Sequence, residues 1–278
     1  MHMFSDTIAL DGRSLKKWIR SPFSILPIVI QAAVWLLLFG NSFNPGNSIP
    51  SSSGGSLGVL QQAFGGAANY ITFLTPGVIG MLALTGMSFL GVDFVWDRLN
   101  GYLDMLKTSP IPRSAIYFGG VLQNIVKAMV AAVITFAVAL IVPDGLRLAA
   151  GFGIWNLLGV FFAIAMLTTV FSTLFTGISI AAKSTDSFFA VVNFLFFPVT
   201  FTSTALFPIN FFPGWLKPLA QANPISLASD AARLLVVNAT LSASQFSTFA
   251  DDILGLFLYV IIFVALGTLL ARNALKAD

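Results

Sequence analysis

Apolar positions gather in long runs that are separated by shorter polar stretches. Between Arg20 and Asp93 there is no charged residue at all. A helix needs about 20 apolar residues to cross the hydrocarbon core of a bilayer. The runs therefore predict an all-α integral membrane protein, a single domain over 1–278 with six transmembrane helices. Their expected bounds are 23–40, 71–95, 117–142, 152–182, 187–208 and 252–271.

Composition narrows the function classes. The chain is 57% hydrophobic and 9% charged, and it has no cysteine. Glutamate is also absent, and the only histidine is His2. We therefore expect no metal site, no histidine-based catalytic centre and no cofactor in this chain. A β-barrel would show short strands of alternating polarity instead.

Lysine and arginine indicate the orientation, because they are enriched in cytoplasmic loops. Counting excludes Lys127, which lies within a predicted span. Ten of the remaining basic residues fall on one side of the six spans and three on the other. This predicts a cell-membrane protein with both termini in the cytoplasm. Because these residues cluster at membrane edges, we expect lipid contacts and no nucleic acid partner.

Two further segments have amphipathic or broken patterns. Residues 1–21 place apolar side chains near one helical face with basic residues beside it, which predicts an interfacial helix on the cytoplasmic leaflet. A plain positive anchor is the alternative. Residues 209–237, together with the neighbouring Pro208, hold four prolines and many apolar residues. They predict short re-entrant helices in the outer leaflet, and an aromatic-belt loop is the alternative.

Residues 96–110 predict a short helix on the cytoplasmic face. One side of it is apolar, with Trp96, Leu99, Leu103 and Leu106 at helical spacing. The neighbouring side is polar, with Asp97, Asn100, Asp104 and Lys107. Proline cannot continue the helical hydrogen bonds, so Pro110 ends the helix. Such a helix suits docking of a cytoplasmic partner, whereas a passive connector is the alternative.

Lys127 is predicted to lie about 15 Å along the third span. A charge there is costly in lipid, so we expect it to face the bundle interior as part of a translocation pathway. Asp93, near the inner end of span two, is the nearest acidic candidate in the sequence. Snorkelling of Lys127 to the interface is the alternative.

The cytoplasmic stretch resembles a motif of the ABC-2 type transporter permeases. Their pattern is roughly E-R-x-x-G-T-L-E-x-L-x-x-S-P, followed by a basic residue. Direct matches in this chain are Arg98, Gly101, Leu103, Leu106 and Pro110, and Arg113 is the basic residue that follows. Asp97 and Asp104 stand where the family has glutamate, and Tyr102 replaces the usual threonine. Asn223-Pro224, followed by Arg233, resembles a second signature of the same family. The likeness is greatest to exporters of the daunorubicin-resistance type.

The resemblance implies a function and partners. Such permeases pair two six-span subunits, so a second copy or a paralogue is expected. Each docks an ATP-binding cassette subunit, which holds ATP and Mg²⁺. Residues 97–107 would form the coupling helix that docks this ATPase. The substrate would be an amphipathic or lipid-like small molecule of the drug or antibiotic type, with a polysaccharide or lipid-linked glycan as the alternative.

Two other function classes remain as alternatives. A membrane-embedded enzyme would need a catalytic group, and Asp251-Asp252 is the only adjacent acidic pair. We interpret this pair as favourable charge at the N-terminus of the last span. A passive channel would need no ATPase. The chain has no Gly-x-x-x-x-Gly-Lys-Ser/Thr loop, so ATP hydrolysis would belong to another chain.

Overall fold

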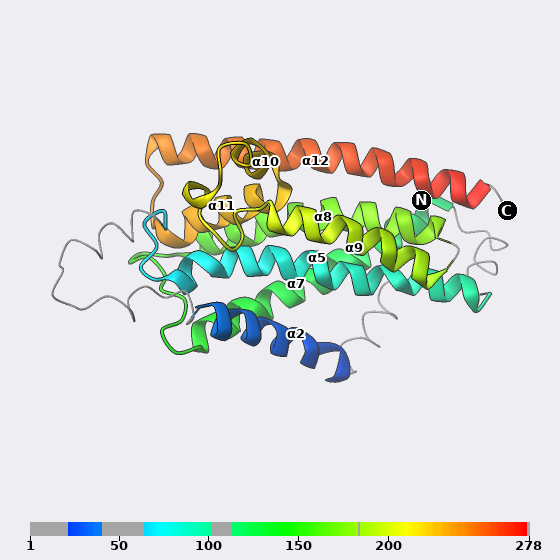
Figure 1. Cartoon of the computed structure of the whole chain (residues 1–278), viewed down its shortest axis with the longest axis horizontal. Helices are drawn as coiled ribbons and strands as arrows, with labels where there is room; N and C mark the ends of the chain where they lie inside the picture. Colours follow the sequence, from blue (N-terminus) through cyan, green and yellow to red (C-terminus); the bar gives the residue numbers. More distant parts are fainter. Residues whose placement is uncertain (1–21, 41–63, 102–112, 183, 277–278) are drawn as a thin grey trace.

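The computed structural model of the protein describes residues 22–40, 64–101, 113–182 and 184–276. Long helices lie roughly side by side along the length of the molecule (Figure 1). Their bounds are α2 Pro22–Val34, α5 Tyr70–Leu99, α7 Arg113–Ile141, α8 Ile154–Ala181, α9 Thr185–Phe201 and α12 Ala243–Lys276. The π-helix η1, Trp35–Phe39, continues α2. Among the described residues no strand occurs.

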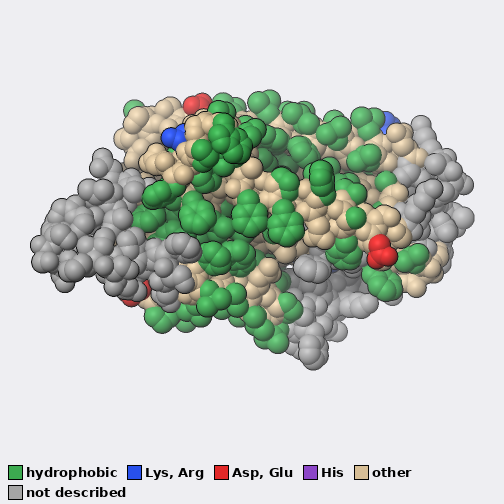
Figure 2. Space-filling view, in the orientation of Figure 1, with side chains coloured by type: hydrophobic (Ala, Val, Ile, Leu, Met, Phe, Trp, Pro, Cys, Tyr) green, Lys and Arg blue, Asp and Glu red, His purple; other side chains and the backbone are tan. Residues whose placement is uncertain are grey.

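Six apolar helical segments of the described chain overlap the six predicted runs. Three are long enough to cross a membrane by length and composition: 117–141, 154–181 and 243–273. Three shorter ones occupy 26–39, 70–86 and 185–201. Hydrophobic side chains dominate the visible face, and the charged ones there lie toward its two ends (Figure 2). The prediction of an all-α membrane protein is confirmed.

Helix α8 is the centre of the bundle. It packs against α5, α7, α11 and α12. Half of its apolar window is buried inside the protein, whereas only 11% of the corresponding window of α12 is buried. Because lipid replaces water around such a bundle, the exposed apolar face of α12 needs no protein partner to be stable.

The helix ends fall into two groups. At one end Asn69, just before α5, donates to the carbonyls of Asp144 and Gly145, just after α7. At the other end Tyr117, near the start of α7, donates to the Thr173 carbonyl in the last third of α8. Successive long helices therefore run in opposite directions through the bundle. The helix ends that flank the predicted cytoplasmic connections lie at the same end of the bundle.

The segment after α9 consists of short helices. They are the 3₁₀-helix η3, Ile209–Phe211, followed by α10, Lys217–Ala222, and α11, Pro224–Val237. Helix α11 packs against α5, α8 and α12. Helix α11 is largely buried, whereas Phe211, Trp215 and Leu219 of the part before it are more than half exposed. The broken, apolar character predicted for 209–237 is therefore present, with protein around α11.

Two boundaries differ from the prediction. Helix α12 begins at Ala243, not near 252, because Ser242 and Gln245 form a reciprocal cap. Asp251-Asp252 therefore lies in the third turn of the helix, and its interpretation as a helix N-terminus is wrong. Helix α9 ends at Phe201, short of 208, in a segment where Thr202 and Ser203 hydroxyls donate to carbonyls of Pro198 and Thr200.

Candidate functional site

A buried polar seam joins α7 to α8. We define it by Asn124 and Val121 of α7 with Thr176 and Ser172 of α8. Asn124 Nδ2 donates to Thr176 Oγ1 at 3.2 Å, and Ser172 Oγ donates to the Val121 carbonyl oxygen at 2.9 Å. The three polar side chains are at most 3% exposed. These contacts give an otherwise apolar bundle a polar interior.

The α8 side of the seam is rich in hydroxyl groups. In a helix a threonine hydroxyl can bond to a carbonyl of the preceding turn, which satisfies it without water. Thr173 Oγ1 does so with the Thr169 and Val170 carbonyls. The buried hydroxyl-bearing residues of α8 are Thr168, Ser172, Thr173, Thr176 and Ser179. They are neutral groups, each at most 1% exposed.

Lys127 lies one turn from Asn124 along α7, and it is 3% exposed. A lysine that snorkelled to the membrane surface would have an exposed ammonium group. The structure therefore places Lys127 inside the protein, as the interior alternative expects. Asp93 lies in α5, and its side chain is outside the described residues.

Asn223 and Pro224 have a local structural role. Asn223 Oδ1 accepts from the Ile225 amide at 2.9 Å, so Asn223 is the N-cap of α11. Its Nδ2 donates to the Val199 carbonyl oxygen at 2.6 Å and to Thr202 Oγ1 at 3.0 Å. Pro224 follows at the first helical position, where a missing amide hydrogen costs nothing. The pair fixes the start of α11 against the end of α9.

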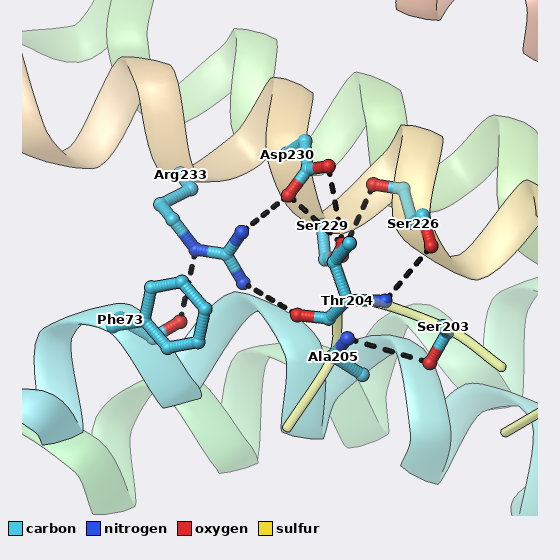
Figure 3. Close-up of polar contacts among 8 residues, drawn as sticks. All are labelled: Phe73, Ser203, Thr204, Ala205, Ser226, Ser229, Asp230 and Arg233. Atoms are coloured by element: carbon cyan, nitrogen blue, oxygen red, sulfur yellow. Dashed lines mark hydrogen bonds and ion pairs between the residues drawn. The ribbon is translucent and has the colours of Figure 1, made fainter. Parts of the chain in front are cut away.

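Arg233 forms what we call the outer clamp, named for the side on which the count of basic residues predicts it, together with Asp230, Thr204 and Phe73 (Figure 3). Its Nη1 pairs with Asp230 Oδ1, one turn earlier on α11. Its Nε donates to the Phe73 carbonyl oxygen of α5 at 3.1 Å, and its Nη2 to the Thr204 carbonyl oxygen at 3.2 Å. One guanidinium thus ties α11 to α5 and to the segment after α9.

Thr204 completes the outer clamp from the other side. Its Oγ1 donates to both carboxylate oxygens of Asp230, at 3.0 and 3.1 Å. Its amide donates to Ser226 Oγ at 2.9 Å. A buried ion pair is stable only when further hydrogen bonds satisfy its remaining atoms, and these contacts supply them.

The predicted coupling residues lie mostly outside the described chain. Trp96 to Leu99 belong to the last turn of α5, so the predicted helix does not begin at 96. A turn at Asn100 and Gly101 follows, where Gly101 has a φ of 74°. Glycine adopts such a φ without strain, which explains the end of α5. Outside the described residues lie Tyr102, Leu103, Asp104, Lys107, Pro110 and the side chains of Asp97 and Arg98.

Several groups that bind Arg233 were not predicted from the sequence. Asp230 stands three residues before Arg233, a spacing that brings two side chains together on a helix, and this signal was available. The carbonyls of Phe73 and Thr204 carry no sequence signal, because only tertiary packing presents them. Within the described residues, no three acidic or histidine side chains gather in a way that could hold a metal ion.

Comparison with known proteins agrees with this architecture. Residues 6–237 match the family described as ABC-2 type transporter. A chain of Porphyra purpurea, named as the transport permease ycf38, is 28% identical over 95% of this chain and 86% of its own length. A Mycobacterium tuberculosis chain, named as the doxorubicin resistance ABC transporter permease DrrC, is 22% identical over 82% of this chain and 76% of its own. The daunorubicin resistance permease DrrB1 of Streptomyces coeruleorubidus is 22% identical over 84% of this chain and 75% of its own length.

The family match covers most of the chain, and the chain belongs to the ABC-2 type transporters. It is a membrane-embedded permease subunit of an ABC transporter, and its relatives include drug-resistance permeases. Permeases of this family generally work with an ATP-binding cassette subunit.

Proposed function

We propose that this ABC-2 permease exports an amphipathic or lipid-like small molecule of the drug or antibiotic type. The substrate leaves the cytoplasm or the inner leaflet and moves outward, while a separate ATP-binding cassette subunit hydrolyses ATP with its Mg²⁺. The permease lies in the cell membrane with both termini in the cytoplasm, paired with a second copy or a paralogue.

The observation that carries the proposal is the polar seam inside an apolar bundle. Lys127 is buried one turn from the seam, and ionisable side chains inside a membrane bundle commonly mark a substrate or ion pathway. An amphipathic molecule that crosses between α7 and α8 would find hydrogen-bond partners there. Its apolar part would contact the phenylalanine and leucine side chains that make up most of the bundle.

Two other observations support the direction and the energy source. The ten-to-three division of basic residues favours a cytoplasmic position for the loop between α5 and α7. This is the loop with the predicted coupling segment, which puts the docking surface where ATP is available. The names of two relatives refer to resistance against doxorubicin and daunorubicin, which outward transport of a drug would produce.

Reconstitution tests the proposal. The permease is co-expressed with the ATP-binding cassette subunit, purified and placed in vesicles, with doxorubicin fluorescence as the probe. We expect ATP-dependent movement of doxorubicin across the bilayer and stimulation of ATP hydrolysis. A complex that moves a lipid-linked glycan but leaves doxorubicin in place would overturn the substrate class. Transport without the ATPase subunit would overturn the energy source.

A further inference from the structure

The predicted cytoplasmic end of the bundle has its own apolar cluster. We call it the inner cluster, and its buried members are Tyr117 and Val121 of α7, Ile180 of α8 and Ala271 of α12. Each of these residues is at most 5% exposed, and none of them belongs to the main core of the described residues. A region held by few buried contacts opens at a lower free-energy cost than a core does. This junction of three helices can therefore separate while the main core stays packed.

Tyr117 ties the three helices of the inner cluster together. Its hydroxyl donates to the Thr173 carbonyl oxygen of α8 at 3.0 Å, and the residue is 2% exposed. A methyl group added at Gly267 of α12 would overlap both the Tyr117 hydroxyl and the Thr173 carbonyl. The hydroxyl thus passes directly over the α12 backbone to reach α8, and the glycine at 267 leaves room for it.

The inner cluster lies between the polar seam and the predicted cytoplasmic end. Along α7, Tyr117 comes one turn before Val121, whose carbonyl belongs to the seam, and about two turns before Asn124. Along α8, which runs the opposite way, Ile180 comes about one turn after Thr176. Both helices therefore place an apolar turn on the cytoplasmic side of their polar turns. A molecule that enters the seam from the cytoplasm along these helices has to displace that turn.

We propose that the inner cluster is a gate that closes the polar seam to the cytoplasm, and that the bond from Tyr117 to Thr173 is its latch. In the arrangement that the structure shows, the ring fills the entrance and the hydroxyl holds α7 against α8. Because α7 begins at Arg113, one turn before Tyr117, a displacement of its start acts on the latch first. The inference rests on the proposed function for its role in transport, and deepens it by naming where access to the seam is controlled.

Cysteine labelling from the cytoplasmic side tests the gate, because the native chain contains no cysteine. Ser172→Cys places a thiol in the seam at a residue that is 0% exposed. Inside-out membrane vesicles are treated with 2-sulfonatoethyl methanethiosulfonate, which does not cross the membrane, and mass spectrometry follows the rate. We expect this thiol to react far more slowly than that of Asn100→Cys in the exposed turn after α5. Equal rates at the two positions would overturn the proposal.

Two buried tyrosines give a matched pair of variants on the Ser172→Cys chain. Tyr117→Phe keeps the ring and removes the latch hydroxyl. One hydrogen bond of ordinary strength shifts an equilibrium by about two- to tenfold, so labelling should accelerate by about that factor. The control is Tyr70→Phe, since Tyr70 is also 2% exposed and its hydroxyl donates to the Leu206 carbonyl oxygen at 2.7 Å, at the opposite end of the bundle. It should leave the rate unchanged. An unchanged rate in Tyr117→Phe, or an equal rise in both variants, would overturn the latch.

The gate and the proposed function can fail separately. The labelling uses neither ATP, nor the ATPase subunit, nor doxorubicin. Labelling rates that do not respond to Tyr117→Phe would therefore remove the gate and leave ATP-driven export standing. Absence of doxorubicin export by the reconstituted complex would remove the proposed substrate and leave the labelling result standing.

Discussion

Arg233 of α11 stacks on the ring of Phe73 in α5, with the guanidinium carbon 3.7 Å from the ring centre. The same side chain donates to the carbonyl oxygen of Phe73. A cation over an aromatic ring is stabilised most where water is excluded. The contact joins two helices that are far apart in the sequence, and Asp230 balances the charge. One polar side chain therefore links α11 to α5 and to the segment after α9.

Removing Arg233 should destabilise the protein strongly. Arg233→Met leaves Asp230 without its counter-charge and two carbonyls without a donor, for an expected loss of about 3–5 kcal/mol. The free energy of unfolding in mixed detergent micelles measures the effect. Arg147→Met is the matched control, because its pair with Asp144 is about two-thirds exposed on both sides. Arg147→Met should lower the free energy of unfolding by less than about 1 kcal/mol. Equal losses in both variants would contradict the outer clamp.

Gly77 should tolerate no side chain. A methyl group there would overlap the Ala205 carbonyl, which lies in the segment between α9 and η3. We expect Gly77→Ala to reduce the free energy of unfolding by about 1–3 kcal/mol, as overpacking does. Gly86 lies in the same helix, and no described residue has an atom within 4 Å of a methyl group added there. Gly86→Ala should therefore be neutral or slightly stabilising, and a loss as large as that of Gly77→Ala would refute the packing argument.

Lys127 should matter more for transport than for membrane insertion. Methionine has a similar length and removes a charge that is costly to insert, so Lys127→Met should insert normally. Export in vesicles should fall by at least about tenfold if the ammonium group takes part in substrate passage, an effect of about 1.4 kcal/mol. Undiminished export by this variant would remove Lys127 from the pathway.

Cysteine labelling tests the orientation, since the native chain contains no cysteine. Ser53→Cys, in the predicted outer loop, should react with a membrane-impermeant maleimide in intact cells. Asn100→Cys, in the exposed turn after α5, should react only after the membrane is permeabilised. The reverse pattern would show that the orientation predicted from the basic residues is wrong. It would also contradict the proposed direction of transport.

The helices could be predicted well from the sequence because a lipid bilayer restricts what a spanning segment can be. Each span must satisfy its own backbone groups and expose apolar side chains, so runs such as 152–182 reveal α8 directly. The early start of α12 was also readable, since Ser242 and Gln245 have the spacing of a capping box. We missed it because hydropathy alone set that boundary.

The site is only partly predictable for a different reason. Lys127 and Arg233 stand out as charges in apolar surroundings, and Asn223-Pro224 as a helix start. What Arg233 binds depends on backbone carbonyls brought together from residues 73 and 204, and every residue has a carbonyl. The hydroxyl groups of α8 are likewise ordinary for a membrane helix, and only the packing of α7 against them makes a seam.

We propose that motion of an ATPase subunit reaches the spans through residues 97–107. Export by the reconstituted complex in vesicles, with the variant Asp97→Ala/Asp104→Ala, tests it most directly. We expect the double variant to insert normally but to lose co-purification of the ATPase subunit or to hydrolyse ATP without export. The control, Asp144→Ala, removes an exposed acid at the opposite end of the bundle and should behave as wild type. Wild-type binding, hydrolysis and export in the double variant would contradict the claim.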